Sequence, residues 1–119
     1  MFRDLSGKEF KKIFIACGYV DLRKGISGLS DLINYHYNLD PLEKGVLFLF
    51  CGRRANVIKG LLWEGDGYLL FTKTLSHGRF HWPRNTDELK ALSPREFQLL
   101  ISGFSLSAFR KAGRKVSAA

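Results

Sequence analysis

The sequence predicts a single α+β domain with an antiparallel or mixed sheet of about five strands and two helices. Three features predict this fold: short apolar runs bounded by glycine, an Asp-Gly turn between β-rich runs, and two stretches in which apolar residues recur at helical spacing. The chain has 119 residues, 45% of them hydrophobic and 13% aromatic, which is enough to fill one core. We expect this domain to span residues 1–105 and a basic, disordered tail to span 106–119.

Two continuous apolar runs predict buried strands. Residues 12–17 (KIFIAC) end at Gly18, and residues 46–50 (VLFLF) lie between Gly45 and Gly52. Both runs are too short for a helix, and neither alternates with polar residues as a half-exposed strand does. We therefore expect both runs to form buried strands.

The middle of the chain predicts an antiparallel meander of three strands. The β-rich runs 55–63 and 68–75 flank the turn Asp66-Gly67, and a third run, 79–83, ends in a proline. Asp-Gly between such runs is typical of a β-hairpin.

The parity of this hairpin predicts which side chains share a face. Lys59 is expected beside Trp63 and Tyr68 on a mixed basic and aromatic face, which a third strand would extend with Arg79. Lys73 is expected on the opposite, more apolar face, which we assign to the core. The mixed face is either an exposed binding platform or a surface covered by one of the helices, with its cations at the rim.

The first predicted helix covers about residues 22–37. Its apolar residues recur every three or four positions, which places them on one stripe. The stripe consists of Leu22, Ile26, Leu29, Ile33 and Tyr37. Asp21 is a suitable N-cap, and glycines in the first turns weaken that end of the helix.

The second predicted helix covers about residues 94–102. Ser93, Pro94 and Glu96 form a capping box with proline at the first helical position. Apolar residues follow at helical spacing, and Gly103 is a plausible stop.

The positive charge of the chain indicates a polyanionic partner. The sequence holds 19 Lys and Arg against 11 Asp and Glu, a net charge of +8. Arginines in the glycine-bounded loop 51–56 and at the start of the first helix are placed to meet phosphates, although a solvated loop and a helix cap are the simpler interpretations. The candidate nucleic-acid-binding residues are Arg53, Arg54, Lys59, Lys73, Arg79, Arg23 and Lys24, and the candidate interaction aromatics are Trp63 and Tyr68.

No motif in the sequence indicates catalysis, a cofactor or a metal. His77 and His81 are four residues apart but not on a helix, and Glu64 and Asp66 are explained by their tight turn. A Walker phosphate loop and a Gly-x-Ser-x-Gly motif are absent from the sequence. We therefore expect a protein that is not an enzyme.

Cysteine spacing and hydropathy predict a cytoplasmic protein. Cys17 and Cys51 lie far apart in apolar stretches, which is typical of buried thiols in a reducing compartment. The sequence contains no apolar run of the roughly 20 residues that a membrane span needs.

The order of several short motifs resembles a known family. The chain is similar, over about residues 13–103, to TnpB, the accessory protein encoded by the second open reading frame of insertion sequences of the sixty-six family. The motifs in family order are Asp21-Leu22-Arg23-Lys24-Gly25, Gly28-Leu29, Asp40-Pro41, Gly52-Arg53-Arg54, Ile58-Lys59, Leu62-Trp63, Gly65-Asp66-Gly67, Lys73, Leu75, Gly78-Arg79-Phe80 and Trp82-Pro83. Leu22 departs from the methionine usual in the family, and position 51 varies within it.

The resemblance implies a transposition accessory protein that acts beside a separate DDE-type transposase and has no known active site of its own. It implies no relation to the RNA-guided nucleases that share the name TnpB, which are far longer. DNA binding, at element ends or without sequence preference, is the function we expect. The alternative is a protein-interaction module that docks on the transposase or its companion protein through Trp63 and Tyr68. A small nuclease is the third hypothesis.

Overall fold

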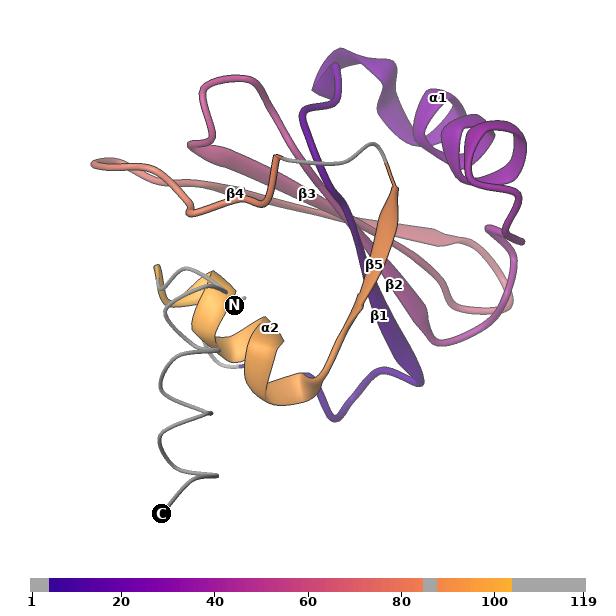
Figure 1. Ribbon diagram of the computed structural model, residues 1–119. Helices are drawn as coiled ribbons and strands as arrows, with labels where there is room; N and C mark the ends of the chain where they lie inside the picture. Colours follow the sequence, from indigo (N-terminus) through magenta and orange to yellow (C-terminus); the bar gives the residue numbers. More distant parts are fainter. Residues whose placement is uncertain (1–4, 85–87, 104–119) are drawn as a thin grey trace.

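One mixed sheet of five strands, in the order β4-β3-β2-β1-β5, forms the centre of the fold (Figure 1). The computed structural model describes residues 5–84 and 88–103, so the tail expected over 106–119 lies outside the described residues. The strands are β1 (Lys12–Ala16), β2 (Val46–Cys51), β3 (Val57–Trp63), β4 (Tyr68–Thr74) and β5 (Leu89–Leu92). The helices are the 3-10 turn η2 (Leu22–Lys24), α1 (Gly25–Asp31), the π-helical turn η3 (Leu32–His36) and α2 (Pro94–Ile101).

The direction of the strands confirms the mixed sheet. β1 runs parallel to β2, and β5 is antiparallel to β1 on its other side. β2, β3 and β4 follow one another in antiparallel order, with Trp63 opposite Tyr68 and Lys59 opposite Thr72 as the hairpin parity predicts. A parallel pair needs a crossover connection, which the helical segment between β1 and β2 supplies.

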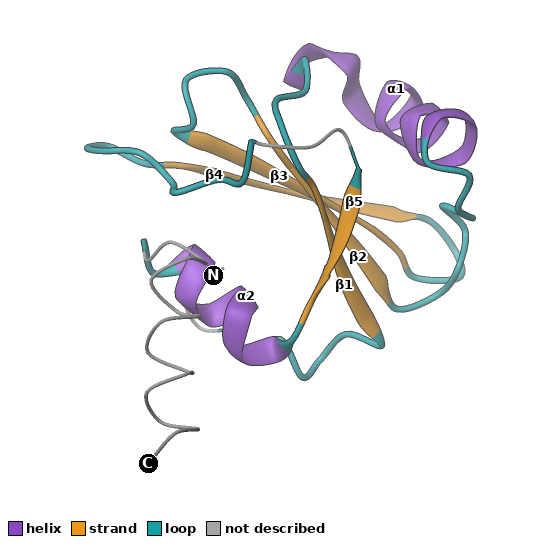
Figure 2. Ribbon diagram, viewed as in Figure 1, coloured by secondary structure: helices purple, strands orange, loops and turns teal. Residues whose placement is uncertain are grey.

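The helices cover opposite faces of the sheet (Figure 2). One cluster packs below α2 and includes Phe97 and Ile58, whereas a second packs below α1 and η3 and includes Ile33 and Leu61. β2 is buried along its whole length because it is covered on both faces. The prediction that only one face of the sheet packs against a core is therefore wrong. The alternative, in which a helix covers the mixed basic and aromatic face, is correct for Tyr68, which packs against the second cluster.

The first helix forms where the spacing predicts it, but Gly25 interrupts it. The side chain of Asp21 caps η2 by accepting a hydrogen bond from the backbone nitrogen of Arg23 at 3.0 Å. Gly25 then takes φ +68°, a left-handed conformation that glycine adopts without a steric cost. Ile26, in the first turn of α1, is 39% exposed, whereas Leu29 in the next turn is fully buried.

The prediction of a third meander strand over residues 79–83 is wrong. Residues 79–83 have no strand conformation, and their backbone bonds to loops at the ends of two other strands. Phe80 donates to the carbonyl of Ala55 at 2.6 Å, and Pro83 accepts from the nitrogen of Gly18 at 2.8 Å. The indole nitrogen of Trp82 donates to the carbonyl of Ala16 at 2.8 Å, which ties this connection to the core.

The second helix begins at the predicted capping box. Ser93 Oγ accepts from the backbone nitrogen of Glu96 at 3.1 Å, and Glu96 Oε1 accepts from the nitrogen of Ser93 at 3.0 Å. Both bonds satisfy backbone donors that the first helical turn otherwise leaves without partners. The cap and the proline at the first helical position define where α2 starts.

Ser93→Ala is expected to lower the free energy of unfolding by about 1 kcal/mol through loss of the cap. Urea denaturation of the variant and the original protein measures the change, with the dependence of the unfolding free energy on urea concentration compared between the two. Affinity for DNA should stay the same. An unchanged denaturation midpoint would contradict the role of Ser93 in holding the start of α2.

Candidate nucleic-acid interface

Parallel pairing of β1 and β2 brings two basic segments to one edge of the sheet. The segment after β1 contains Arg23, and the loop after β2 contains Arg53 and Arg54. Val20 donates its backbone nitrogen to the carbonyl of Cys51 at 2.9 Å, which joins the two segments directly. The edge formed by the carboxyl ends of parallel strands is where α/β sheets commonly bind ligands.

The loop between β2 and β3 is a tight turn that presents two arginines. Ala55 donates its backbone nitrogen to the carbonyl of Gly52 at 2.9 Å and adopts φ +60°, while its side chain is buried. Arg53 and Arg54 lie at the tip of this turn and are exposed. The buried, bonded base of the turn thus fixes the position from which both guanidinium groups reach solvent.

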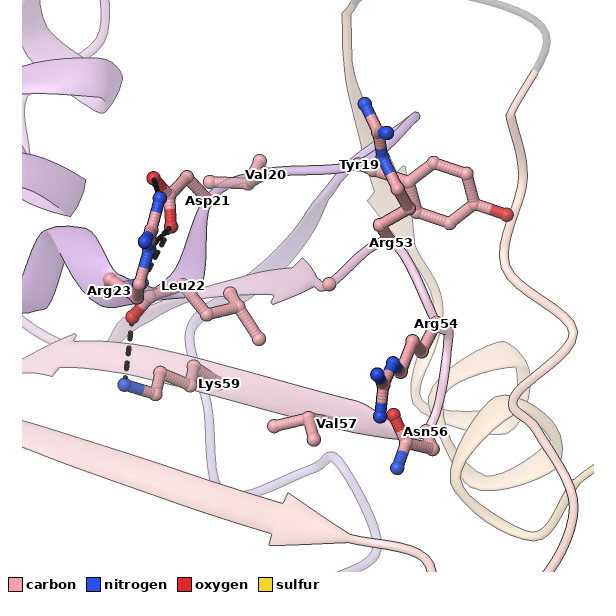
Figure 3. Close-up of a pocket in the computed structure, with 11 residues that line it drawn as sticks. Tyr19, Val20, Asp21, Leu22, Arg23, Arg53, Arg54, Asn56, Val57 and Lys59 are labelled. Carbon is pink, nitrogen blue, oxygen red and sulfur yellow. Dashed lines mark hydrogen bonds and ion pairs between the residues drawn. The ribbon is translucent and has the colours of Figure 1, made fainter.

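These segments and β3 enclose a groove of about 910 Å³ (Figure 3). We call it the basic groove, and it is lined by Tyr19, Val20, Asp21, Leu22, Arg23, Gly52, Arg53, Arg54, Asn56, Val57 and Lys59. In the close-up, Leu22 and Val57 lie between Arg23 and Lys59 on one side and Arg54 on the other. The groove therefore has an apolar floor and a cationic rim.

The basic groove carries a net charge of +3, from four cationic side chains and the single carboxylate of Asp21. Arg23 binds that carboxylate with two contacts, from Nε to Oδ1 at 3.0 Å and from Nη2 to Oδ2 at 3.1 Å. Hydrogen bonds from the Arg23 side chain and backbone lower the pKa of Asp21 to about 2. Asp21 is therefore ionised at neutral pH.

Lys59 connects β3 to the helical turn on the rim of the groove. Its Nζ donates to the carbonyl oxygen of Leu22 at 2.9 Å, and its side chain is half-buried. Lys59 thus contributes one positive charge and also holds η2, which carries Arg23, against the sheet.

Lys59→Met is expected to lower the free energy of unfolding by about 1.5 kcal/mol, because a charged hydrogen bond is lost and the Leu22 carbonyl loses its donor. Thermal and urea denaturation measure this cost. Lys73→Met is the matched control, since Lys73 lies opposite Ile58 on the α2 side of the sheet. Equal midpoints for the two variants would contradict the positioning role of Lys59.

The structure brings together four of the seven predicted cations. Arg23, Arg53, Arg54 and Lys59 line the basic groove. The other three lie outside its lining: Lys24 at the end of η2, Lys73 on the α2 face of β4, and Arg79 on the exposed connection after β4.

The two predicted aromatics lie at the other end of the β3–β4 hairpin. The rings of Trp63 and Tyr68 meet edge to face with centroids 5.0 Å apart. Burial raises the pKa of Tyr68, and Ser30 of α1 interacts with its hydroxyl. The rings contact each other edge to face, and Tyr68 also packs against the second core cluster, so the pair does not form a flat, open stacking surface.

The sequence did not indicate Tyr19 and Asn56 in the lining, and the candidate site residues did not include Arg84, which lies beside it. Arg84 lies over the ring of Tyr19, with its guanidinium carbon 5.3 Å from the ring centroid. Tyr19 follows β1 and Asn56 precedes β3. Their shared location follows from the parallel β1–β2 pair, which the sequence pattern did not specify.

Residues 5–84 and 88–103 contain no cluster of metal ligands and no reactive thiol. In these ranges no three His, Cys, Asp or Glu side chains gather as metal ligands do. Cys17 and Cys51 are buried, and burial raises the pKa of Cys51 to about 12, so its reactive thiolate is scarce at neutral pH.

None of the helices described has the length and apolar character for crossing a bilayer.

Comparison with known proteins identifies the family. The chain is 38% identical to the uncharacterized protein y4hO of Sinorhizobium fredii over 77% of this chain and 79% of the relative. It is 33% identical to the uncharacterized protein y4jC of the same organism over 84% of this chain and 85% of the relative. No solved structure matches the chain significantly. A family profile described as IS66 Orf2 like protein matches residues 11–111, and the chain therefore belongs to this family of insertion-sequence proteins, which supports an accessory role in transposition.

Proposed function

We propose that the protein binds DNA through the basic groove, at the ends of its insertion sequence or without sequence preference, in support of a separate transposase. The observation that carries this proposal is the convergence of Arg23, Arg53, Arg54 and Lys59 on one groove from three separate parts of the chain. Each of these side chains alone is an ordinary surface cation. Together they give the groove a net positive charge that a phosphate backbone complements.

Arginine suits this task because its planar guanidinium binds two phosphate oxygens at once. Arg53 and Arg54 are exposed on a turn whose base is buried and hydrogen-bonded, so the turn backbone loses little conformational entropy when they meet a phosphate. Arg23 is already oriented by Asp21, which leaves part of its donor set facing outward. The groove is thus prepared for an extended polyanion.

In this role the chain holds DNA and the transposase performs the strand chemistry. The partners are then DNA, the transposase and its companion protein, in the cytoplasm of a bacterial cell. No cofactor takes part in phosphate binding of this kind, since the protein cations neutralise the backbone directly.

The salt dependence of binding to duplex DNA tests this function. With four phosphate contacts and a decrement of about 0.9 per contact, log K should fall against log salt with a slope of about −3.6. Fluorescence anisotropy with a labelled duplex, titrated at several salt concentrations, measures the slope. A slope near zero, or no binding at low salt, would contradict the proposal and favour the docking module built on Trp63 and Tyr68.

A further inference from the structure

We propose that the basic groove takes an unpaired nucleotide of DNA, so that the protein prefers single-stranded or frayed DNA to an intact duplex. This inference rests on the proposed function and narrows it, since it names the form of DNA that the groove accepts. Three features of the groove support it: an apolar floor, a concave shape, and an aromatic and an amide group beside the cations.

The apolar floor distinguishes unpaired from paired DNA. Val20, Leu22 and Val57 line the groove between the cations and are only partly buried. A duplex presents phosphates and sugars at its surface while its base faces are stacked inside, so it gains little from an apolar floor. An unpaired base has a free apolar face, and placing that face on Leu22 and Val57 removes both surfaces from water.

The shape of the groove leads to the same conclusion. Its volume of about 910 Å³ falls within the range of roughly 300–1,000 Å³ typical of pockets for small ligands. Cations lie on both sides of the floor in the close-up, with Arg23 and Lys59 on one side and Arg54 on the other (Figure 3). A strand that crosses the groove can therefore place phosphates on both rims while one base enters between them.

Tyr19 and Asn56 complete the set of groups that a base requires. Tyr19 is 36% exposed, and the guanidinium carbon of Arg84 lies over its ring, so the two side chains form a cation–π pair at the edge of the groove. Sequence-tolerant binding of single strands combines such aromatic surfaces with a basic track. Asn56 offers an amide donor and acceptor that can pair with the hydrogen-bonding edge of a base.

Three DNA probes with equal numbers of phosphates test the inference: a blunt duplex, a duplex with a single-stranded tail, and a single strand. Measured by anisotropy at one salt concentration, the tailed and single-stranded probes should bind at least about fivefold tighter than the blunt duplex, the lower end of what stacking supplies. Tyr19→Ala combined with Asn56→Ala should abolish this preference, so that the variant binds all three probes with the same affinity. Tyr35→Ala is the matched control, because Tyr35 is 76% exposed and lies outside the groove lining.

The outcomes separate this inference from the function on which it rests. Equal affinity for all three probes, with a steep salt slope retained, would overturn the preference for unpaired DNA and leave DNA binding in place. Binding to none of the probes would overturn both. A tail of RNA that binds more tightly than the same tail of DNA would overturn the assignment of DNA. A preference that survives in the Tyr19 and Asn56 double variant would contradict the location of the site.

Discussion

Replacement of both Arg53 and Arg54 by glutamate is expected to weaken DNA binding on the order of a hundredfold at about 50 mM salt. Each lost phosphate contact removes roughly a tenfold contribution at this salt concentration, and the new carboxylates add repulsion. Both arginines are exposed at the tip of the β2–β3 turn, so the fold should be preserved. The salt slope should also become shallower by about two units, and anisotropy titrations measure both effects.

The matched control is the pair Lys73→Glu and Arg79→Glu. Either double variant lowers the net charge of the chain from +8 to +4, but Lys73 and Arg79 lie outside the groove lining. A groove-specific interaction predicts that only the arginine pair loses most of its affinity. Equal losses in the two variants would mean that overall charge, and not the basic groove, carries the binding.

Local chemistry explains why much of the fold could be predicted from the sequence. The turn at Asp66 and Gly67 sets the hairpin register, and the capping box at Ser93 marks the start of α2. Both features depend on residues within a few positions of one another. The same holds for the Asp21 cap, which bonds the backbone two residues along the chain.

Long-range pairing explains most of what could not be predicted. Periodicity identifies β1 and β2 as buried strands but does not state that they lie side by side in parallel. From the sequence alone, the segment with Arg23 and the loop with Arg53 are therefore two separate candidate phosphate sites. Only the parallel pair places the segments after both strands at one edge, where they form a single groove.

The faces of the sheet could not be predicted for a related reason. The second face of β3 contains Lys59 and Trp63, and this mixture of polar and aromatic residues is compatible with either exposure or cover by a helix. The position of α1 resolves the ambiguity, because it buries Leu61 and leaves Lys59 at the rim. Residues 79–83 continue the pattern of the meander and end at Pro83, which predicts a third strand, but their backbone hydrogen bonds are made to loops near Ala55 and Gly18.

Phe97→Ala is expected to destabilise the fold by about 3–5 kcal/mol, a large part of the roughly 5–15 kcal/mol that holds a domain of this size together. Phe97 is fully buried on the inner side of α2, and its ring meets the ring of Phe10 edge to face with centroids 6.0 Å apart. Truncation removes that contact and leaves a cavity between helix and sheet. Urea denaturation measures the loss, with Gln98→Ala, on the exposed side of the same helix, expected to change stability by less than about 0.5 kcal/mol.

This variant also tests whether the two faces of the sheet have separate tasks. Phe97 belongs to the cluster below α2, whereas Leu22 in the groove packs with the cluster below α1. At a low temperature where the variant is still folded, its affinity for DNA should therefore match that of the original protein. A loss of affinity without unfolding would show that α2 and the groove are coupled through the sheet. A stability loss below about 1 kcal/mol would contradict the tight packing of α2.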